Sequence, residues 1–340
     1  MGMLVDGRWL NDDDLLFEGA YQRPASLIRA DNAGAVARLI AEVPDRYLLI
    51  GSRSCPWSHR TLLTLGLKGL PLPVHYAFGP RLQGYALNGG DAWDVPGSGK
   101  NGYHLHEVYT LHDPAFTGRV TVPVLWDKSA QQIISNESTD ILAILDLVEV
   151  SEHIDFTLIP SVLAAETETA NQTVYDGLNN AFYQAGFAQS QDAYDASVTK
   201  VFETLDALDQ RLAASRYYFG DVLTLTDLHI FPTLIRFDAI YAILFKCCLR
   251  RLIDYPNLWG YARDLYGLKD VAETVDFDRM REASYLSDTN EPHPVVAIAP
   301  DVDWNGAHSR SELGQTKIAL RSGKLIVVDP QTLQPITDVP

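Results

Sequence analysis

The stretch that decides the fold is Tyr47-Leu-Leu-Ile-Gly-Ser-Arg-Ser-Cys-Pro-Trp-Ser-His-Arg60. Its first four residues form an apolar run that a glycine ends, which is typical of a short buried strand. Pro56 suits the first position of a helix, where its missing N–H costs little. The leucines from Leu62 to Leu67 continue that helix toward a stop at Gly69. Cys55 is therefore predicted at the N-terminus of a helix that directly follows a strand.

The next segments complete the strand and helix pattern of a thioredoxin fold. Residues 72–78 indicate a second strand, and residues 121–126 with 131–135 indicate a hairpin. Hydroxyl, amide and acidic residues cluster at 135–140, as a helix N-terminus prefers. Proline is unusual inside a strand, so we expect Pro123 to be a structural cis-proline at the strand start. A cysteine at a helix start and a proline before the third strand together suggest the thioredoxin fold.

The rest of the chain divides into an extension, a helical region and a tail. After a linker near 151–161, apolar side chains recur with a 3.6-residue period from Val198 to Leu212, and residues 225–242 are apolar on most sides. These patterns predict an all-helical bundle. The predicted division is an N-terminal extension (1–45), a thioredoxin-like α/β domain (46–150) with a structured or functional insertion (79–118), an all-helical domain (162–310) and a tail (311–340).

Composition narrows the class of protein. The 340-residue chain carries 44 Asp and Glu against 27 Lys and Arg, a formal net charge of −17. Such a chain repels phosphate backbones and anionic membrane surfaces, so neither nucleic acid nor a membrane is expected as a partner. The sequence shows no targeting segment and no apolar run of about 18 residues. The three cysteines form no disulfide framework. We therefore expect a soluble, cytoplasmic protein.

Cys55 is the strongest candidate for chemistry. Helix N-termini and nearby cations favour the reactive thiolate, and basic residues flank Cys55 on both sides. Ser58 stands where a dithiol oxidoreductase has its second cysteine, so an internal disulfide cannot form. A redox cycle then needs an external thiol, of which glutathione is the obvious one. A buried, inert cysteine is the plainer alternative. Cys247 or Cys248 could supply a resolving thiol, although adjacent cysteines usually serve packing.

Other cofactor motifs are weak or missing. His104 and His106 are followed by His112, but no cysteine or acidic residue completes a zinc pattern at a suitable spacing. No GxGxxG or Walker A motif is present. Metal binding and nucleotide binding are therefore not expected.

A glutathione site would need donors for two carboxylates and acceptors for an ammonium group. The main chain of Val122 can pair with the cysteinyl backbone, as an extended peptide does at a sheet edge. Glu137 can meet the γ-glutamyl ammonium, and Ser138 at the helix start can bind the γ-glutamyl carboxylate. Plain helix capping is the alternative for both residues, and the two roles are compatible.

Several separated segments resemble one family, the glutathionyl-hydroquinone reductases or Xi-class glutathione transferases. Together they cover roughly residues 15–310. The matching segments are 54–62 (SCPWSHRTL), 118–128 (GRVTVPVLWDK), 135–138 (SNES), 185–188 (AGFA), 236–238 (RFD), 245–247 (FKC) and 254–258 (DYPNL), with a weaker match at 21–26 (YQRPAS).

The resemblance implies a glutathione-transferase fold in a homodimer, with glutathione as co-substrate. It implies that Cys55 attacks the glutathionyl sulfur of a glutathionyl-hydroquinone. Hydroquinone then leaves, and a second glutathione releases oxidised glutathione from the Cys55 mixed disulfide. The leaving ring carbon must be protonated, so an acid should lie near the ring.

The resemblance also assigns site residues. It implies that glutathione is bound by Trp93, Arg119, Val122, Glu137 and Ser138. Tyr183 matches a tyrosine that lines the hydroquinone pocket, where a phenol can donate a hydrogen bond or a proton. A second pocket tyrosine corresponds either to Tyr285 or, one residue earlier, to Ser284.

Two other functions remain open. A general thiol transferase, acting in deglutathionylation or dehydroascorbate reduction, would use the same Cys55 chemistry with a different acceptor pocket. A non-catalytic carrier of apolar ligands would use the scaffold alone, but the retention of Cys55, Pro123 and Glu137-Ser138 speaks against it.

Overall fold

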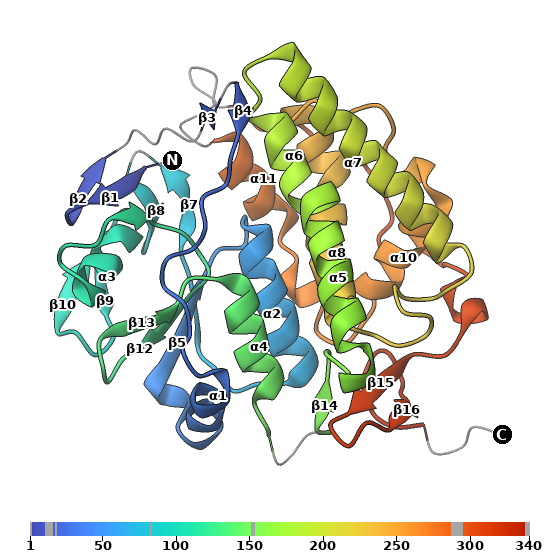
Figure 1. Ribbon diagram of the computed structural model, residues 1–340, viewed down its shortest axis with the longest axis horizontal. Coiled ribbons are helices and arrows are strands. Elements are labelled where there is room, and N and C mark those ends of the chain that lie inside the picture. The colour runs from blue at the N-terminus through green and yellow to red at the C-terminus, as the bar shows by residue number, and fades with distance from the viewer. Residues whose placement is uncertain are drawn as a thin grey trace.

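The computed structural model describes residues 2–10, 16–17, 19–81, 83–150, 154–286 and 295–336. An α/β domain and a helical domain lie side by side (Figure 1), as the sequence predicted. None of the described helices combines the length and the apolar character needed to cross a membrane.

The α/β domain is built on a four-stranded sheet in the order β13-β12-β5-β6. The strands are β5 (Tyr47–Gly51), β6 (Val74–Tyr76), β12 (Val124–Asp127) and β13 (Gln132–Ser135). β5 is parallel to β6 and antiparallel to β12, and β12 is antiparallel to β13. β12 begins later than the sequence pattern indicated, because Pro123 has no N–H to donate to a ladder.

Side chains of β5 alternate between the two faces of this sheet. Tyr47 and Leu49 belong to one buried cluster, and Leu48 and Ile50 belong to the other. The Leu48 face packs against α3 (Leu105–His112). The helices that contribute to the cluster on the Tyr47 face are α1 (Ala33–Glu42), α2 (Pro56–Lys68) and α4 (Ser138–Leu147). The sheet is therefore covered on both faces, and the N-terminus of α2 follows the carboxyl end of the inner strand β5.

The insertion between β6 and β12 is structured and is tied to the start of the chain. It contains two hairpins before α3, and it ends in β11 (Gly118–Arg119). β11 pairs with β1 (Met3–Val5), which pairs in turn with β2 (Arg8–Leu10). The hairpin strands are β7 (Phe78–Arg81), β8 (Gly84–Ala86), β9 (Trp93–Val95) and β10 (Lys100–Gly102). The N-terminal hairpin thus holds the strand that carries Arg119.

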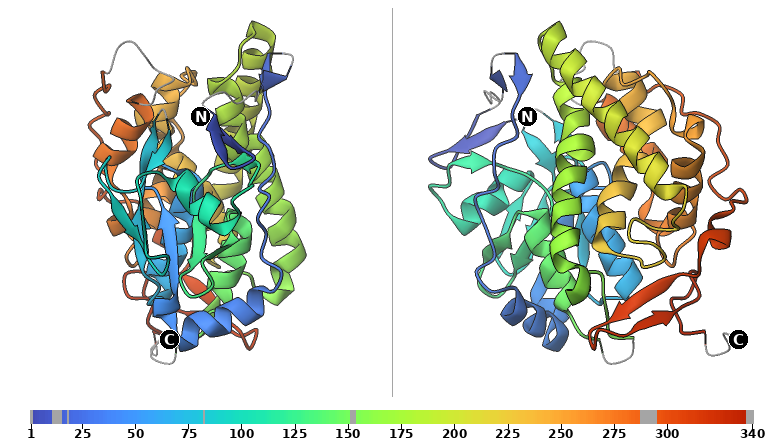
Figure 2. Two further views of the ribbon diagram at one scale, coloured as in Figure 1. Left: turned by 90° about the vertical axis from the view of Figure 1, so that its left-hand side faces the viewer. Right: turned by 45° about the vertical axis from the view of Figure 1, so that its right-hand side comes forward.

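A strap of the N-terminal extension, residues 19–30, runs across both domains (Figure 2). It includes β4 (Ala20–Tyr21), which pairs with β3 (Leu16–Phe17). In the helical domain the Gly19 carbonyl accepts a hydrogen bond from the Gln189 N–H. At α4, Arg29 pairs with Asp140 at 2.6 Å. The strap therefore borders the groove between the domains.

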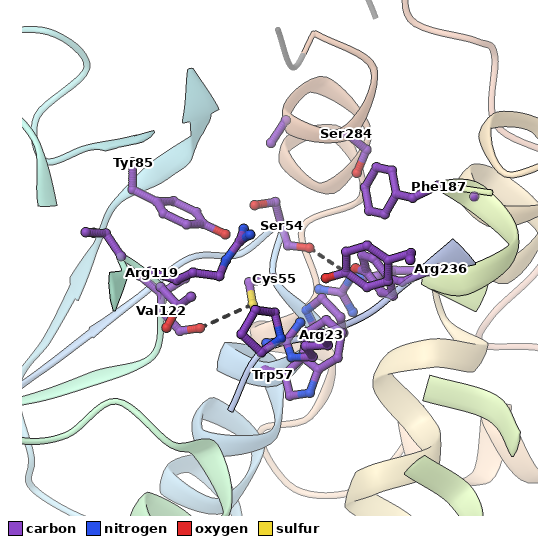
Figure 3. Close-up of a pocket in the computed structure, with 18 of the residues that line it drawn as sticks. Arg23, Ser54, Cys55, Trp57, Tyr85, Arg119, Val122, Phe187, Arg236 and Ser284 are labelled. Atoms are coloured by element: carbon purple, nitrogen blue, oxygen red, sulfur yellow. Dashed lines mark hydrogen bonds between the residues drawn. The ribbon is translucent and has the colours of Figure 1, made fainter. Parts of the chain in front are cut away.

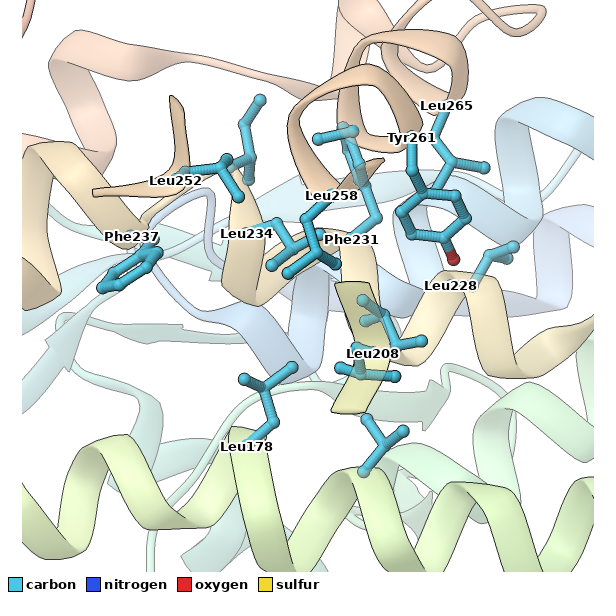
Figure 4. Close-up of a cluster of buried hydrophobic side chains, with 14 of the residues drawn as sticks. Leu178, Leu208, Leu228, Phe231, Leu234, Phe237, Leu252, Leu258, Tyr261 and Leu265 are labelled. Carbon is cyan, nitrogen blue, oxygen red and sulfur yellow. The ribbon is translucent and has the colours of Figure 1, made fainter. Parts of the chain in front are cut away.

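The helical domain is organised around a helix that is buried on every side. This helix, α8 (Leu225–Leu234), contributes Leu228, Phe231 and Leu234 to the core that Figure 4 shows. The sequence predicted one helix over 225–242, but a π-helical turn, Phe237–Tyr241, follows α8. The other helices of the domain are α5 (Ala164–Val174), α6 (Asn180–Gly186), α7 (Gln191–Leu212), α9 (Ala242–Leu244), α10 (Pro256–Tyr266) and α11 (Phe277–Tyr285).

The C-terminal tail is part of the fold rather than a separate hairpin. Its strands β15 (Lys317–Leu320) and β16 (Leu325–Val327) form a sheet with β14 (Phe156–Thr157) of the interdomain linker. Arg321 follows β15 and pairs with Asp155 at 2.6 Å. The tail thereby fixes the linker between the two domains.

Candidate active site

A cavity of about 260 Å³ lies where the two domains and the strap meet. The α/β domain supplies the end that contains Cys55, and the helical domain supplies an aromatic end. Figure 3 shows Cys55 between Tyr85 and Arg119 on one side and Phe187 and Arg236 on the other. The cavity therefore has a polar half that surrounds a thiol and an apolar half that faces it.

Cys55 occupies the N-cap position of α2, as the sequence predicted. Its backbone is extended, and Pro56 is the first helical residue, so the chain turns sharply at the sulfur. The side chain is only 8 % exposed, and Sγ donates a hydrogen bond to the Val122 carbonyl at 3.6 Å. The positive end of the α2 dipole favours negative charge at this position. The geometry suits a thiol that reacts as a thiolate.

Val122 lies opposite this thiol, in the segment that leads into β12. The Val122–Pro123 peptide bond is cis, as the sequence predicted. Val120, Thr121 and Val122 all line the cavity. Their main chain forms one wall, against which an extended peptide could lie.

Cations gather at the polar half of the cavity. Arg119 lies on β11 and Arg23 lies on the strap, and both line the cavity. The Arg23 guanidinium lies 3.7 Å from the centre of the Trp57 ring, a cation–π contact that orients it. The net charge of the whole chain is strongly negative, but this end of the cavity is suited to an anion.

Tyr85 is the nearest phenol to the thiol on the α/β side. Burial raises the pKa of Tyr85 well above its usual range, and the neighbouring Cys55 sulfur raises it further. The phenol therefore keeps its proton at neutral pH and can act as a hydrogen-bond donor to a charged sulfur.

Glu137 and Ser138 lie at the start of α4, just behind the cavity wall. Glu137 is the N-cap and accepts hydrogen bonds from the Thr139 N–H at 3.1 Å and from Ser26 at 2.8 Å. Burial raises the pKa of Glu137, but these hydrogen bonds outweigh burial and leave its pKa below the usual value. Within the described residues it is Asn136, rather than Glu137 or Ser138, that lines the cavity. Helix capping is therefore the role that the geometry gives Glu137 directly.

The apolar half is an aromatic cluster around Tyr183 of α6. The Tyr183 ring lies 4.9 Å from that of Trp57 and 5.3 Å from that of Phe245. Burial raises the pKa of Tyr183 well above its usual range, and the nearby Tyr241 hydroxyl raises it further. Tyr183 thus presents a protonated phenol to a cavity of aromatic character.

The structure separates two predicted residues from the cavity. Trp93 stacks on His75, with ring centres 3.9 Å apart, and does not line the cavity. Tyr285 is buried, and its hydroxyl donates to the Ala239 carbonyl at 3.0 Å. Ser284 lines the cavity instead. Trp93 and Tyr285 are therefore not part of the cavity lining, and their assignment to the site stays a prediction; of the two alternatives near 284–285, Ser284 is the one that lines the cavity.

Among the cavity-lining residues that were assigned no role from the sequence are three polar ones close to Cys55, namely Arg23, Tyr85 and Arg236. Arg23 and Arg236 lie in segments that resemble the family, and this resemblance could have identified both as candidate site residues. Tyr85 lies in the insertion, where no periodic pattern distinguishes one aromatic residue from another.

One group of side chains could approach a metal ion. His104, His106 and Glu107 each offer a ligand atom, and these atoms lie within 4.8 Å of one another. His106 also stacks on Trp9, and a Glu107 oxygen accepts the Tyr103 N–H at 2.9 Å. The group lies outside the cavity lining, so it bears on no step at Cys55. The expectation that the protein binds no metal stays a prediction.

Comparison with known proteins shows the class to which this fold and site belong. Residues 54–148 match the family model of the glutathione S-transferase N-terminal domain, and residues 191–264 match that of the C-terminal domain. Among solved structures, a Xi-class glutathione transferase from Natrialba magadii superposes with a TM-score of 0.77 at 34 % identity, over 92 % of this chain and 98 % of that chain. The glutathione-bound structure of YqjG, a glutathione transferase homologue from Escherichia coli K-12, gives a TM-score of 0.75 at 34 % identity, over 91 % of this chain and 99 % of that chain.

Curated relatives narrow the class further. The glutathionyl-hydroquinone reductase YqjG of Escherichia coli is 39 % identical over 91 % of this chain and 98 % of that protein. The glutathionyl-hydroquinone reductase PcpF of Sphingobium chlorophenolicum is 37 % identical over 88 % of this chain and 96 % of that protein. The chain therefore belongs to the glutathionyl-hydroquinone reductase family, the Xi class of glutathione transferases, and is a glutathione-dependent enzyme.

Proposed function

We propose that the protein reduces glutathionyl-hydroquinones to hydroquinones at the expense of glutathione. The observation that carries the proposal is the position of Cys55, a single thiol between a cationic half and an aromatic half of one cavity. A glutathionyl-hydroquinone has the same two halves, an anionic tripeptide and an aromatic ring joined at a sulfur. With each half of the substrate in the matching half of the cavity, the Cys55 thiol would face the sulfur that joins them.

In the first step the Cys55 thiolate attacks the glutathionyl sulfur. A sulfur–sulfur bond forms, the sulfur–carbon bond breaks, and its electron pair leaves with the ring carbon. That carbon takes up one proton and becomes the C–H of the hydroquinone. In the second step a glutathione thiolate attacks the mixed disulfide, which frees Cys55 as a thiolate and releases oxidised glutathione. Over the cycle one glutathione thiol and the thioether sulfur of the substrate are oxidised to the disulfide, and the ring carbon is reduced by two electrons.

Tyr183 is the proposed donor to the ring. Its pKa is raised by burial, so its phenol is protonated throughout the neutral range. Its ring is held in the aromatic half of the cavity by contacts with Trp57 and Phe245. Ser284 is proposed as a second polar contact to the hydroquinone.

Glutathione is proposed to lie in the polar half. Arg119 and Arg23 would bind its carboxylates, and the Val122 main chain would pair with the cysteinyl residue. Asn136 lies between the cavity and the pair Glu137 and Ser138. These two residues would therefore contact the γ-glutamyl end of glutathione through a bridging water or after Asn136 moves. Tyr85 replaces Trp93 in the proposed set, because its ring faces the thiol.

General thiol transfer is the second candidate, because it uses the same Cys55 chemistry. The aromatic half of the cavity favours an aromatic acceptor over dehydroascorbate, whose ring is small and polar. The homodimer and the cytoplasmic location stay predictions from the family resemblance and from composition.

The test is a turnover assay with a glutathionyl-hydroquinone and glutathione, in which hydroquinone and oxidised glutathione are both measured. We expect them in equal amounts, and we expect Cys55→Ser to abolish both. Cys248→Ser is the matched control, because Cys248 is exposed and lies outside the cavity lining. Reduction of dehydroascorbate at a higher kcat/KM than the hydroquinone adduct would select the second candidate.

A further inference from the structure

Arg236 reaches the loop of Cys55 from the other domain. It lies just after the end of α8, before the π-helical turn, and is only 1 % exposed. Its Nε donates to the Ser54 carbonyl at 3.2 Å and its Nη2 to the Arg53 carbonyl at 2.8 Å. Two consecutive carbonyls directly before the reactive cysteine are therefore held by one guanidinium of the helical domain. Figure 3 shows Arg236 beside Ser54.

The remaining hydrogen bonds of Arg236 fix its position. Nη1 donates to the Pro232 carbonyl at 2.7 Å and to His59 Nδ1 at 2.9 Å. Because His59 Nδ1 accepts, its Nε2 carries the proton and donates to Thr274 at 2.7 Å. Burial lowers the pKa of His59 well below its usual value, and the Arg236 charge lowers it further, so His59 is neutral. Arg236 is therefore the charged member of the Arg236–His59 pair.

That charge has no acidic counterpart in the part of the chain that the structure describes. All hydrogen bonds found for Arg236 go to carbonyls and to a neutral imidazole. Burial lowers the pKa of Arg236, and the ionisable groups that oppose this effect are Tyr241, Tyr183 and Cys55. A buried cation is costly unless a negative charge compensates it. Of these three groups, the thiol is the one that gives up its proton in the proposed cycle.

We infer that Arg236 is a positioning residue for Cys55, which holds the backbone of the cysteine loop and supplies the buried positive charge that stabilises the Cys55 thiolate. Only the consequence of this role for catalytic turnover rests on the proposed function. The charge and the hydrogen bonds act on the free enzyme, before any substrate binds.

Other charged or titratable groups also face Cys55. Arg60 is also buried, and burial lowers its pKa to about 10 although Glu137 and Cys55 oppose this effect; its guanidinium donates to Asn179 at 2.5 Å. Arg23 and Arg119 lie at the end of the cavity proposed for the glutathione carboxylates. The phenols that face the sulfur are Tyr85, Tyr183 and Tyr241. Among these cations, Arg236 is the one that donates hydrogen bonds to the backbone of the cysteine loop itself.

The test is the rate of Cys55 alkylation by iodoacetamide as a function of pH, measured on the full-length protein by mass spectrometry of the Cys55 peptide. Arg236→Gln should slow alkylation at pH 7 about tenfold and move the midpoint of the profile upward by about one pH unit, which is the effect of removing one nearby positive charge. Arg236→Lys keeps the charge but loses the fork of hydrogen bonds. It should keep the midpoint and lower kcat in the hydroquinone assay.

Arg310→Gln is the matched control. Arg310 is 3 % exposed and, like Arg236, donates to backbone carbonyls, but these belong to Leu212 and Arg216 in the helical domain. This variant should leave the alkylation profile of Cys55 unchanged. If Arg236→Gln does not fold, Arg236→Met is the neutral variant that fills the same buried volume.

A neutral Arg236 variant with the alkylation rate and midpoint of the unmodified protein would overturn the inference. Because alkylation needs no glutathionyl-hydroquinone, its result is separate from the fate of the proposed function. A shifted profile in a protein that turns over no hydroquinone adduct would refute the function and leave the inference standing.

Discussion

The Cys55 thiol donates a hydrogen bond to the Val122 carbonyl across the cavity, at 3.6 Å. This contact joins the N-terminus of α2 to the segment that precedes β12, and it leaves the sulfur between the cationic and the aromatic halves of the cavity. On the proposed function, a substrate sulfur that meets Cys55 would carry its peptide portion toward Val122 and its ring toward Tyr183. The predictions below test this orientation.

Tyr183→Phe should lower kcat for the hydroquinone adduct at least tenfold, because it removes the proposed proton donor and keeps the ring packing. Tyr285→Phe should leave kcat within about twofold. The Tyr285 hydroxyl donates to Ala239, so its loss should instead lower the free energy of unfolding by about 1 kcal/mol. Steady-state kinetics and urea unfolding measure the two effects. The reverse order in kcat would show that the hydroquinone lies elsewhere.

Arg23→Ala should raise the KM for glutathione roughly tenfold, because a charge-assisted hydrogen bond to a carboxylate is lost. The change should weaken as the salt concentration rises. Arg38→Ala is the control, because Arg38 is exposed on α1 and its substitution removes the same charge from the chain. An equal change in KM in both variants would mean that only the overall charge matters.

Tyr85→Phe should lower kcat/KM severalfold, because its hydroxyl is proposed to donate to the Cys55 sulfur. Trp93→Phe should change kcat/KM less than twofold, because Trp93 stacks on His75 away from the cavity. Both variants keep an aromatic ring, so they report on the polar group and on placement rather than on packing. A larger loss of kcat/KM in Trp93→Phe than in Tyr85→Phe would show that Trp93 contributes to glutathione binding.

Asp146→Asn should lower the free energy of unfolding by about 3 kcal/mol, because it leaves a buried Lys68 without its ionic partner. Lys68 and Asp146 are each 4 % exposed at the side chain and lie 3.6 Å apart. Asp146 also accepts the Leu158 N–H of the interdomain linker at 2.8 Å. Asp155→Asn, in a more exposed pair with Arg321, should cost less than 1 kcal/mol. Equal losses in chemical denaturation would contradict this account of the linker.

Local sequence was sufficient to predict the position of Cys55. An apolar run, a proline at the first helical position and a glycine stop are signals within one short segment, and they fix the helix start. The cis bond before Pro123 was predictable for the same reason. The break after α8 was not predictable, because a helix that is apolar on every side gives no periodic mark of where it ends.

Residues that reach the site through tertiary packing could not be ranked from the sequence. Arg236 and Arg23 lie near Cys55 only because the helical domain and the strap pack against the α/β domain in the folded protein. In the insertion, Trp93 and Tyr85 are equally plausible as aromatic contacts until the hairpins are folded. Neighbouring residues on a helix point about 100° apart, so a shift of one position exchanges the buried Tyr285 for the cavity-lining Ser284.

The most direct test of the central claim is a single turnover in the absence of free glutathione, followed by mass spectrometry of the intact protein and of its cysteine peptides. With a glutathionyl-hydroquinone in excess, the account predicts one hydroquinone released per protein chain and one glutathione adduct, located on Cys55. Hydroquinone release without an adduct on Cys55, or an adduct on Cys247 or Cys248 instead, would contradict it.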